Sequence, residues 1–287
     1  MAWPSLLEGA ADTRSPSAIR TMRRILVISS HVAQDTVGLS PTIAPLQRAG
    51  IEVVALPTVV LSNHPAREKC AGVILEPAAL EKMSGAIEAN GWLGTFDAVL
   101  TGYLPSAGHA TWVARLIKRM REISPQIIYV CDPILGDDPE GLYIDAAAAA
   151  VVRDALVPLA DITTPNRFEL GWLSRQEVQS PEDAAQAALA LACPIVAATS
   201  IPSGPDELAN VLSQSGNVQV STVKKLADVP HGTGDLFTGF LTARLLNGAS
   251  VSDAWTHATQ GVAFGVEASR GSDRLMLPLI DWAWLST

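Results

Sequence analysis

The sequence predicts a layered α/β fold, in which a mostly parallel sheet lies between two layers of helices. Short apolar runs alternate with longer helix-like segments along most of the 287 residues, and this order is typical of strand–helix–strand crossovers. The strand-like runs are apolar on both faces, as in parallel sheets that helices cover on both sides. Neither an internal repeat nor a low-complexity linker divides the chain. We therefore expect a single-domain three-layer α/β/α sandwich over residues 24–287.

The expected strands are brief and rich in β-branched residues, which favour extended backbone. They lie at 25–29, 51–56, 96–100, 127–131, 161–163 and 194–199. Residues 59–61 either extend the second strand or begin a flap, ahead of a turn at 62–65. Residues 208–212 and 218–223 are expected to pair as a hairpin, because the polar segment 213–217 between them contains glycine.

Helices are expected where longer segments follow a start signal. Ser180 is a good N-cap and Pro181 suits the first helical position, while Gly50 lies just past the end of the first helix. The expected helices cover 40–49, 77–90, 107–123, 146–159, 181–192, 236–246 and 251–269. A further helix is expected to begin after Pro165-Asn166 and to end at 173.

Composition excludes several classes of protein. A net charge of −9 and a pI near 5.0 argue against a nucleic-acid partner or an anionic membrane surface, and no apolar run reaches transmembrane length. The three cysteines form no C-x-x-C pair, so they predict neither a zinc ribbon nor a redox motif, and they fit a cytoplasmic protein. Residues 1–23 lack a continuous apolar region and are expected to be a flexible extension rather than a signal peptide.

The four residues Gly232-Thr233-Gly234-Asp235 give the strongest indication of function. They precede the apolar helical stretch 236–246. A glycine turn that opens a helix offers free backbone N–H groups and the positive end of the helix dipole, which suits a transferring phosphoryl group. An aspartate there would repel that anion unless it takes the proton of an attacking hydroxyl, so the motif indicates a kinase for a small alcohol. The alternative is an ordinary helix start with a favourable first-turn charge.

Polar residues follow five of the expected strands, at the edge where ligands bind in open parallel sheets. The clusters are Ser30-His31, Thr101-Gly102-Tyr103, Asp132-Pro133, Thr164-Pro165-Asn166 and Thr199-Ser200. Magnesium needs oxygen ligands, so the candidates are Asp132, Asp137 and Glu169. The alternatives are a surface turn for Asp137 and an exposed helical position for Glu169. Walker P-loop, dinucleotide-fingerprint and G-x-S-x-G motifs do not occur in the sequence, so the late glycine turn must hold the phosphates.

At this point the chain resembles the ribokinase-like superfamily and, within it, the pyridoxal kinases. The motifs occur in the family's order over about residues 24–270. They are Ser30-His31-Val32, Ser62-Asn63-His64, Thr101-Gly102-Tyr103-Leu104, Cys131-Asp132-Pro133-Ile134-Leu135-Gly136-Asp137, Ala160-Asp161-Ile162-Thr163-Thr164-Pro165-Asn166-Arg167-Phe168-Glu169 and Gly232-Thr233-Gly234-Asp235-Leu236-Phe237. The resemblance implies transfer of the ATP γ-phosphoryl group to the 5′-hydroxymethyl group of pyridoxal, with pyridoxine and pyridoxamine as further acceptors.

The resemblance also implies the role of each site residue. Asp235 is the general base and contacts the substrate, and Gly232, Thr233 and Gly234 form an anion hole. Asp132 and Glu169 organise Mg²⁺ and its waters beside ATP. The nucleotide site further takes Asp137, Asn166, Thr199 and Thr233. The pyridine ring is bordered by Ser30, which hydrogen-bonds it, Val37 and Tyr103. A monovalent cation such as K⁺ and a homodimer are implied as well.

The departures from the family lie on the vitamin side. Residues 33–39 lack the family's usual Gly-aromatic and Gly-Asn pairs. Leu61 stands where a phenylalanine is common, and Pro65 has neither a hydroxyl nor an N–H to offer. The acceptor is therefore less firmly predicted than phosphoryl transfer. The rivals are a kinase of another hydroxymethyl heterocycle, such as hydroxymethylpyrimidine, and a non-catalytic vitamin-binding protein on the same fold.

Overall fold

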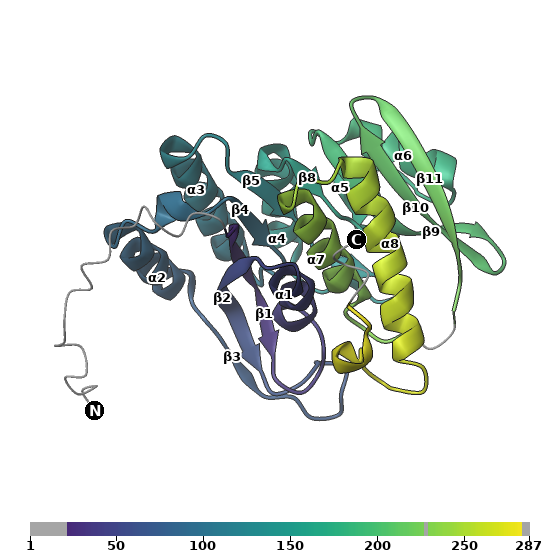
Figure 1. The fold of residues 1–287 in the computed structure, drawn as a ribbon, viewed down its shortest axis with the longest axis horizontal. Helices are drawn as coiled ribbons and strands as arrows, with labels where there is room; N and C mark the ends of the chain where they lie inside the picture. The colour runs from purple at the N-terminus through teal and green to yellow at the C-terminus, as the bar shows by residue number, and fades with distance from the viewer. Residues whose placement is uncertain (1–21, 227–228, 283–287) are drawn as a thin grey trace.

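The computed structural model describes residues 22–226 and 229–282, and Figure 1 shows their arrangement. The predicted extension 1–23 lies outside the described residues except at its last two positions. A nine-stranded sheet runs through the described part of the chain. In sheet order its strands are β11 (Asn217–Lys224), β10 (Glu207–Gln214), β9 (Ile195–Gly204), β8 (Ile162–Thr163), β5 (Ile128–Cys131), β4 (Ala98–Thr101), β1 (Arg24–Val32), β2 (Glu52–Leu61) and β3 (Gly72–Ile74).

The centre of the sheet is parallel and its two edges are antiparallel. Strands β2, β1, β4, β5, β8 and β9 pair in parallel with their neighbours. The hairpin β10–β11 adds to one edge and β3 to the other in antiparallel register. The mostly parallel sheet predicted from the alternation of runs and helices is thus confirmed, and the carboxyl ends of its central strands share one edge.

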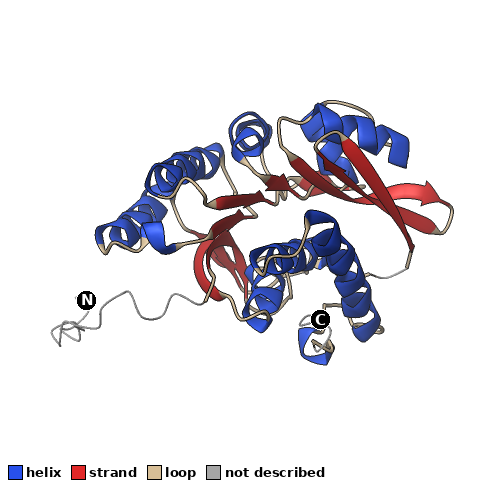
Figure 2. Cartoon of the chain, turned by 45° about the horizontal axis from the view of Figure 1, so that its top comes forward, coloured by secondary structure: helices blue, strands red, loops and turns tan. Residues whose placement is uncertain are grey.

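Helices cover both faces of the sheet, as Figure 2 shows. Alternate residues of β1 point into two cores: Leu26 and Ile28 into one, Ile25 and Val27 into the other. The first core takes α2 (Pro77–Ala89), α3 (Ala107–Ile123) and α4 (Ala146–Val151), and it is continued by α5 (Arg167–Ser174) and α6 (Pro181–Ala190). The second core takes α1 (Leu39–Arg48), α7 (Thr233–Leu246) and α8 (Val251–Ala268). The three-layer sandwich is therefore observed.

Several elements differ from the expected ranges. Residues 59–61 extend β2, which creates an edge on which the unpredicted β3 pairs. The helix expected over 146–159 leaves α geometry after Val151, through a π-helical turn (Val152–Leu156) and a 3-10 turn (Val157–Leu159). Pro158 explains this change, because its ring removes an N–H donor and clashes with the preceding turn. None of the helices in the described ranges is long and apolar enough to span a membrane.

Candidate active site

The polar residues that follow β4, β5 and β8 meet at one edge, as the topology requires. The backbone N–H of Asp132 donates to the carbonyl of Thr101 (2.9 Å), and that of Thr164 donates to the carbonyl of Cys131 (3.2 Å). Farther along the edge, Asn166 and Thr199 form a parallel bridge, with the Thr199 N–H donating to Pro165. The predicted clusters of four strands are thus neighbours in the folded chain.

The Gly232-Thr233-Gly234-Asp235 turn begins α7 in the geometry that its sequence predicts. Gly232 is the N-cap with φ of 94°, a left-handed conformation that glycine adopts readily. A Cβ at this position would overlap the carbonyl oxygen of Thr36. Gly234 is exposed, with open space where a side chain would be. The first-turn N–H groups have no acceptor within the helix and face this space, so the turn can receive an anion.

Asp235 is the third residue of α7, and its carboxylate is held from one side. Its Oδ2 accepts a 2.9 Å hydrogen bond from the backbone N–H of Gly38. Its Oδ1 is buried and has no hydrogen-bond partner within the described part of the chain. Burial raises the pKa of Asp235 from 3.8 to about 7, against the opposing effect of the Gly38 hydrogen bond. The carboxyl is therefore poised to exchange a proton near neutral pH.

Two more acids lie near Asp235. Asp132 is 6% exposed, and its Oδ2 accepts a 3.0 Å hydrogen bond from the hydroxyl of Thr238 on α7. The Thr238 hydroxyl also contacts that of Thr164 (2.9 Å). Burial, followed by the negative charges of Asp235 and Glu169, raises the pKa of Asp132 well above its ordinary value. A buried carboxyl beside two other acids, as Asp132 is, forms a site that a cation would stabilise.

Glu169 is fixed in place by backbone N–H groups. It forms a capping box with Asn166: the Asn166 N–H donates to Oε2 (2.9 Å), and the Glu169 N–H donates to Asn166 Oδ1 (2.9 Å). Its Oε1 accepts from the N–H of Leu135 (2.8 Å). Burial nevertheless raises its pKa from 4.5 to about 7. Glu169 is thus a buried capping residue rather than an exposed one, with both oxygens already engaged.

The acids fit a loosely held magnesium ion. In the described part of the chain, no group of three or more His, Cys, Asp or Glu side chains is arranged to enclose a metal. Mg²⁺ keeps several waters and is usually bound by one or two carboxylates together with substrate phosphates. Asp132 would be the direct ligand, because a single hydroxyl occupies its Oδ2. Glu169 would act through water, because backbone N–H groups already occupy both of its oxygens.

The remaining residues predicted to contact nucleotide lie around the capping box. Asn166 uses its amide group to donate to the carbonyl of Gly136 (2.9 Å), and so fixes the segment that carries Asp137. Asp137 belongs to the two-residue strand β6 (Gly136–Asp137), which pairs with β7 (Gly141–Leu142). Burial of the carboxyl raises the pKa of Asp137 above its ordinary value, and the charge of His231 opposes that rise.

Two of the predicted acceptor residues, Ser30 and Val37, lie next to Gly38, which holds Asp235. Ser30 is buried, and a Cβ on Gly38 would overlap it, so this serine and the Gly38 N–H that holds Asp235 are in contact. Val37 lines a cavity of about 190 Å³. Tyr103 is half-buried, and its backbone accepts from the hydroxyl of Thr58 (2.8 Å) and donates to Ser29 Oγ (3.1 Å).

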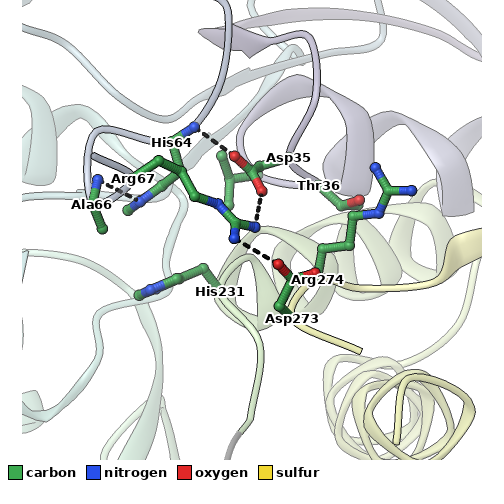
Figure 3. Close-up of a pocket in the computed structure, with 9 residues that line it drawn as sticks. Asp35, Thr36, His64, Ala66, Arg67, His231, Asp273 and Arg274 are labelled. Carbon is green, nitrogen blue, oxygen red and sulfur yellow. Dashed lines mark hydrogen bonds and ion pairs between the residues drawn. The ribbon is translucent and has the colours of Figure 1, made fainter. Parts of the chain in front are cut away.

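Figure 3 shows this cavity. Its walls come from the loop after β1, the β2–β3 loop, the segment before α7 and the segment after α8. The lining residues are Asp35, Thr36, Val37, His64, Ala66, Arg67, His231, Asp273 and Arg274. The rings of His64 and His231 stack with centroids 4.5 Å apart and an interplanar angle of 13°. The Ala66 N–H donates to Nδ1 of His64 (3.2 Å), so the ring is held from within its own loop.

Sequence reasoning missed four residues that shape this site. Gly38 supplies the N–H that holds Asp235, and Thr238 holds Asp132. Asp35 and Arg67 join two walls of the cavity by an ion pair of 2.6 Å. A glycine just before a helix was a usable signal for Gly38. For Thr238 the usable signal was its position one turn after Asp235, since residues three or four apart share a helix face.

Comparison with known proteins identifies the family of the chain. A family model described as phosphomethylpyrimidine kinase matches residues 58–275. The pyridoxal kinase PdxY of Deinococcus radiodurans is 35% identical over 246 residues, which are 82% of this chain and 83% of the relative. A pyridoxine/pyridoxal/pyridoxamine kinase of Bordetella avium is 32% identical over 265 residues, 90% of each chain.

The solved structures extend the likeness to the whole fold. The pyridoxal kinase of Leishmania donovani in complex with ADP and pyridoxine superimposes with a TM-score of 0.84 at 28% identity, covering 89% of this chain and 92% of that one. The ribokinase-like fold expected from the motifs is thus confirmed. The chain belongs to the phosphomethylpyrimidine kinase family and, within it, to the pyridoxal kinases.

Proposed function

We propose that this chain transfers the γ-phosphoryl group of ATP to the 5′-hydroxymethyl group of pyridoxal, and so makes pyridoxal 5′-phosphate in vitamin B6 salvage. Pyridoxine and pyridoxamine are further proposed acceptors. One observation carries the proposal: the carboxylate of Asp235 lies at the start of α7 with Oδ1 buried and without a partner in the described residues. Leaving such an oxygen unpaired costs about 1–3 kcal/mol or more, and an acceptor hydroxyl would supply the missing hydrogen bond.

The proposed reaction is an in-line transfer. Oδ1 of Asp235 takes the proton of the acceptor hydroxyl, whose oxygen forms a bond to the γ-phosphorus while the bond to the ADP oxygen breaks. The Gly38 N–H holds Oδ2 and keeps Oδ1 directed at the hydroxyl. The N–H groups of the turn at Gly232, Thr233 and Gly234 stabilise charge on the transferring group. Mg²⁺, held by Asp132 and by waters that Glu169 organises, would neutralise the phosphate oxygens.

Substrate contacts are proposed on both sides of Asp235. Ser30, Val37 and Tyr103 would border the pyridine ring, and Asp137, Asn166 and Thr199 would lie along the nucleotide. We also propose that the enzyme is a cytoplasmic homodimer that uses K⁺ as a monovalent cation. These assignments follow from the family resemblance, and mutation of each side chain followed by separate KM measurements for pyridoxal and ATP would test them.

The first experiment compares Asp235→Asn with Asp253→Asn. Asp253 is the matched control because it is the third residue of α8, where it caps the helix start with Ser250. It lies beyond the far end of the 14-residue α7, about 20 Å from the site. We expect Asp235→Asn to lower kcat by several orders of magnitude with ATP binding largely kept, and Asp253→Asn to retain wild-type kcat. Unchanged turnover in Asp235→Asn would remove this residue from the mechanism.

A second candidate is phosphorylation of a hydroxymethylpyrimidine, since the matching family model is described as phosphomethylpyrimidine kinase. Both acceptors present a primary alcohol on a flat heterocycle, and the base and anion hole would serve either. A spectrophotometric assay for pyridoxal phosphate, run beside an ADP-release assay with the pyrimidine alcohol, separates them. Turnover of the pyrimidine without turnover of pyridoxal would replace the first proposal by the second. Failure of both acceptors would favour a non-catalytic binding protein.

A further inference from the structure

An ion-paired cluster joins three chain segments over the cavity beside the catalytic turn, as Figure 3 shows. Its centre is Arg67, in the loop between β2 and β3. One end of the guanidinium donates to Asp35 Oδ1 (2.6 Å), in the loop after β1. The other donates to Asp273 Oδ2 (2.5 Å), in the segment after α8. These three residues are far apart in the sequence, so the cluster fixes how the segments meet.

Asp35 is the buried member of the cluster. Its side chain is 5% exposed, against 41% for Arg67 and 69% for Asp273. A buried carboxylate is unfavourable unless its oxygens are paired. Both oxygens of Asp35 are paired, because Oδ2 also accepts from the backbone N–H of His64 (2.7 Å). The Arg67 guanidinium holds the pKa of Asp35 below its ordinary value. Asp35 therefore binds the β2–β3 loop at two points, through a side chain and through the backbone.

The segment that carries Asp35 is also the segment that contacts the catalytic turn. Thr36 places its carbonyl oxygen against Gly232, and Gly38 donates to Asp235. A shift of residues 35–38 would thus reach the base directly. On the other side, His64 stacks on His231, the residue that precedes the glycine turn. The Asp35 carboxylate lies between the β2–β3 loop and the residues that set the position of the base.

We propose that Asp35 is a positioning residue for the phosphoryl acceptor: its carboxylate holds the loop 62–71 closed over the cavity next to Asp235. The inference rests on the proposed function for the identity of the acceptor. The loop forms one wall of the 190 Å³ cavity through His64, Ala66 and Arg67. ATP phosphates, by contrast, are assigned to the first turn of α7 and the acids near Asp132. Loss of Asp35 should therefore affect the acceptor more than the nucleotide.

The test combines kinetics with hydrogen–deuterium exchange on Asp35→Asn. We expect the KM for pyridoxal to rise about tenfold, while the KM for ATP changes less than about twofold, because the loosened loop lines the cavity and the ATP phosphates are assigned to the first turn of α7. Amide exchange in peptides covering 62–71 should become faster, and exchange in α3 should stay the same. Asp154→Asn is the control, since it removes an exposed ion pair with Arg153 in the helical layer on the opposite face of the sheet.

Arg67→Gln provides a second route to the same result. Its side chain is partly exposed, so the variant should fold even where Asp35→Asn does not, and it should raise the same KM and the same local exchange. The double variant should be no worse than the more affected single one, because both remove one interaction. Equal rises in the two KM values, or unchanged exchange at 62–71 in either folded variant, would overturn the proposal. Amide exchange is measured without substrate. A failure of this proposal can therefore be told apart from a failure of the proposed function, in which the wild-type enzyme would not phosphorylate pyridoxal.

Discussion

Replacement of Gly38 by alanine should impair catalysis far more than it impairs folding. Gly38 has φ of 65°, and a Cβ there would overlap both the carbonyl oxygen and the hydroxyl of Ser30. With ψ of −127° as well, Gly38 lies outside the left-handed helical region in a conformation that almost only glycine adopts, and this alone costs an alanine about 1–3 kcal/mol. The overlap with a backbone carbonyl cannot be relieved by a side-chain rotation. The segment would have to move by about 1 Å to restore an ordinary contact of about 3.5 Å.

That movement would act on the base, because the N–H of Gly38 is the group that holds Asp235 Oδ2. A misplacement of about 1 Å in a catalytic constellation can cost about 100-fold in rate. We therefore expect kcat of Gly38→Ala to fall by about two orders of magnitude in a coupled ADP-release assay. The melting temperature should fall by only several degrees, at about 2–4 °C per kcal/mol for a chain of this size.

Gly50→Ala is the matched control. Gly50 lies at the other end of α1, also has a positive φ of 76°, and has no atom within 4 Å of the position of an added Cβ. It should show the conformational cost of about 1–2 kcal/mol without the loss of rate. A Gly38→Ala enzyme that keeps half or more of the wild-type kcat would refute the reasoning. So would an equal loss of kcat in Gly50→Ala, because the effect would then come from strain alone.

Two pH dependences follow from the buried acids. The kcat/KM for the acceptor should rise with pH and level off above an apparent pKa of about 7, because only ionised Asp235 accepts a proton and burial raises its pKa to about 7. A profile that is flat from about pH 5.5 to about pH 8.5, where an ordinary carboxyl is already ionised, would contradict this. Folded-state pKa values of about 7 for Asp235 and Glu169 exceed the ordinary 3.8 and 4.5. The stabilisation that they give is therefore complete below about pH 4 and lost as the pH rises through 7. The ligand-free protein should melt at a higher temperature at pH 5 than at pH 8 by calorimetry, and Mg²⁺ with ATP should narrow the difference. A melting temperature that rises steadily over that range would contradict the assignment.

Local patterns predicted the parts of the site that depend on local geometry. The glycine turn could be recognised because a left-handed N-cap and a close approach to Thr36 both require glycine at 232. The Asn166–Glu169 capping box was not predicted, although the three-residue spacing was a usable signal for it. The convergence of Asp132 with them followed from topology, since parallel strands end at one edge. Most helix bounds differed from the expected ones by one or two residues, whereas α7 begins three residues earlier and α4 ends at Val151.

Long-range side-chain contacts could not be predicted in this way. Gly38 and Asp235 are 197 residues apart, and Arg67 is 206 residues from Asp273. No periodicity or spacing relates such residues, because their contact depends on how three loops pack after the sheet has formed. The unpredicted strand β3 belongs to the same class. Its pairing partner is the extended end of β2, and Val73 and Ile74 favour extended backbone but form too short a run to assign alone.

The difference between local backbone geometry and long-range side-chain contacts bears on how the acceptor is selected. In the proposed mechanism backbone N–H groups hold the transferring phosphoryl group, and any phosphoryl donor can use them. In the β2–β3 loop, by contrast, the backbone N–H groups already have acceptors within the protein. The His64 N–H donates to Asp35 and the Ala66 N–H donates to His64 Nδ1, while Pro65 has no N–H. An acceptor at this wall therefore meets side chains rather than backbone donors. Its recognition depends on residues whose positions are set by the Asp35–Arg67 pair, so acceptor preference can change through that pair while Asp235 and the anion hole stay the same.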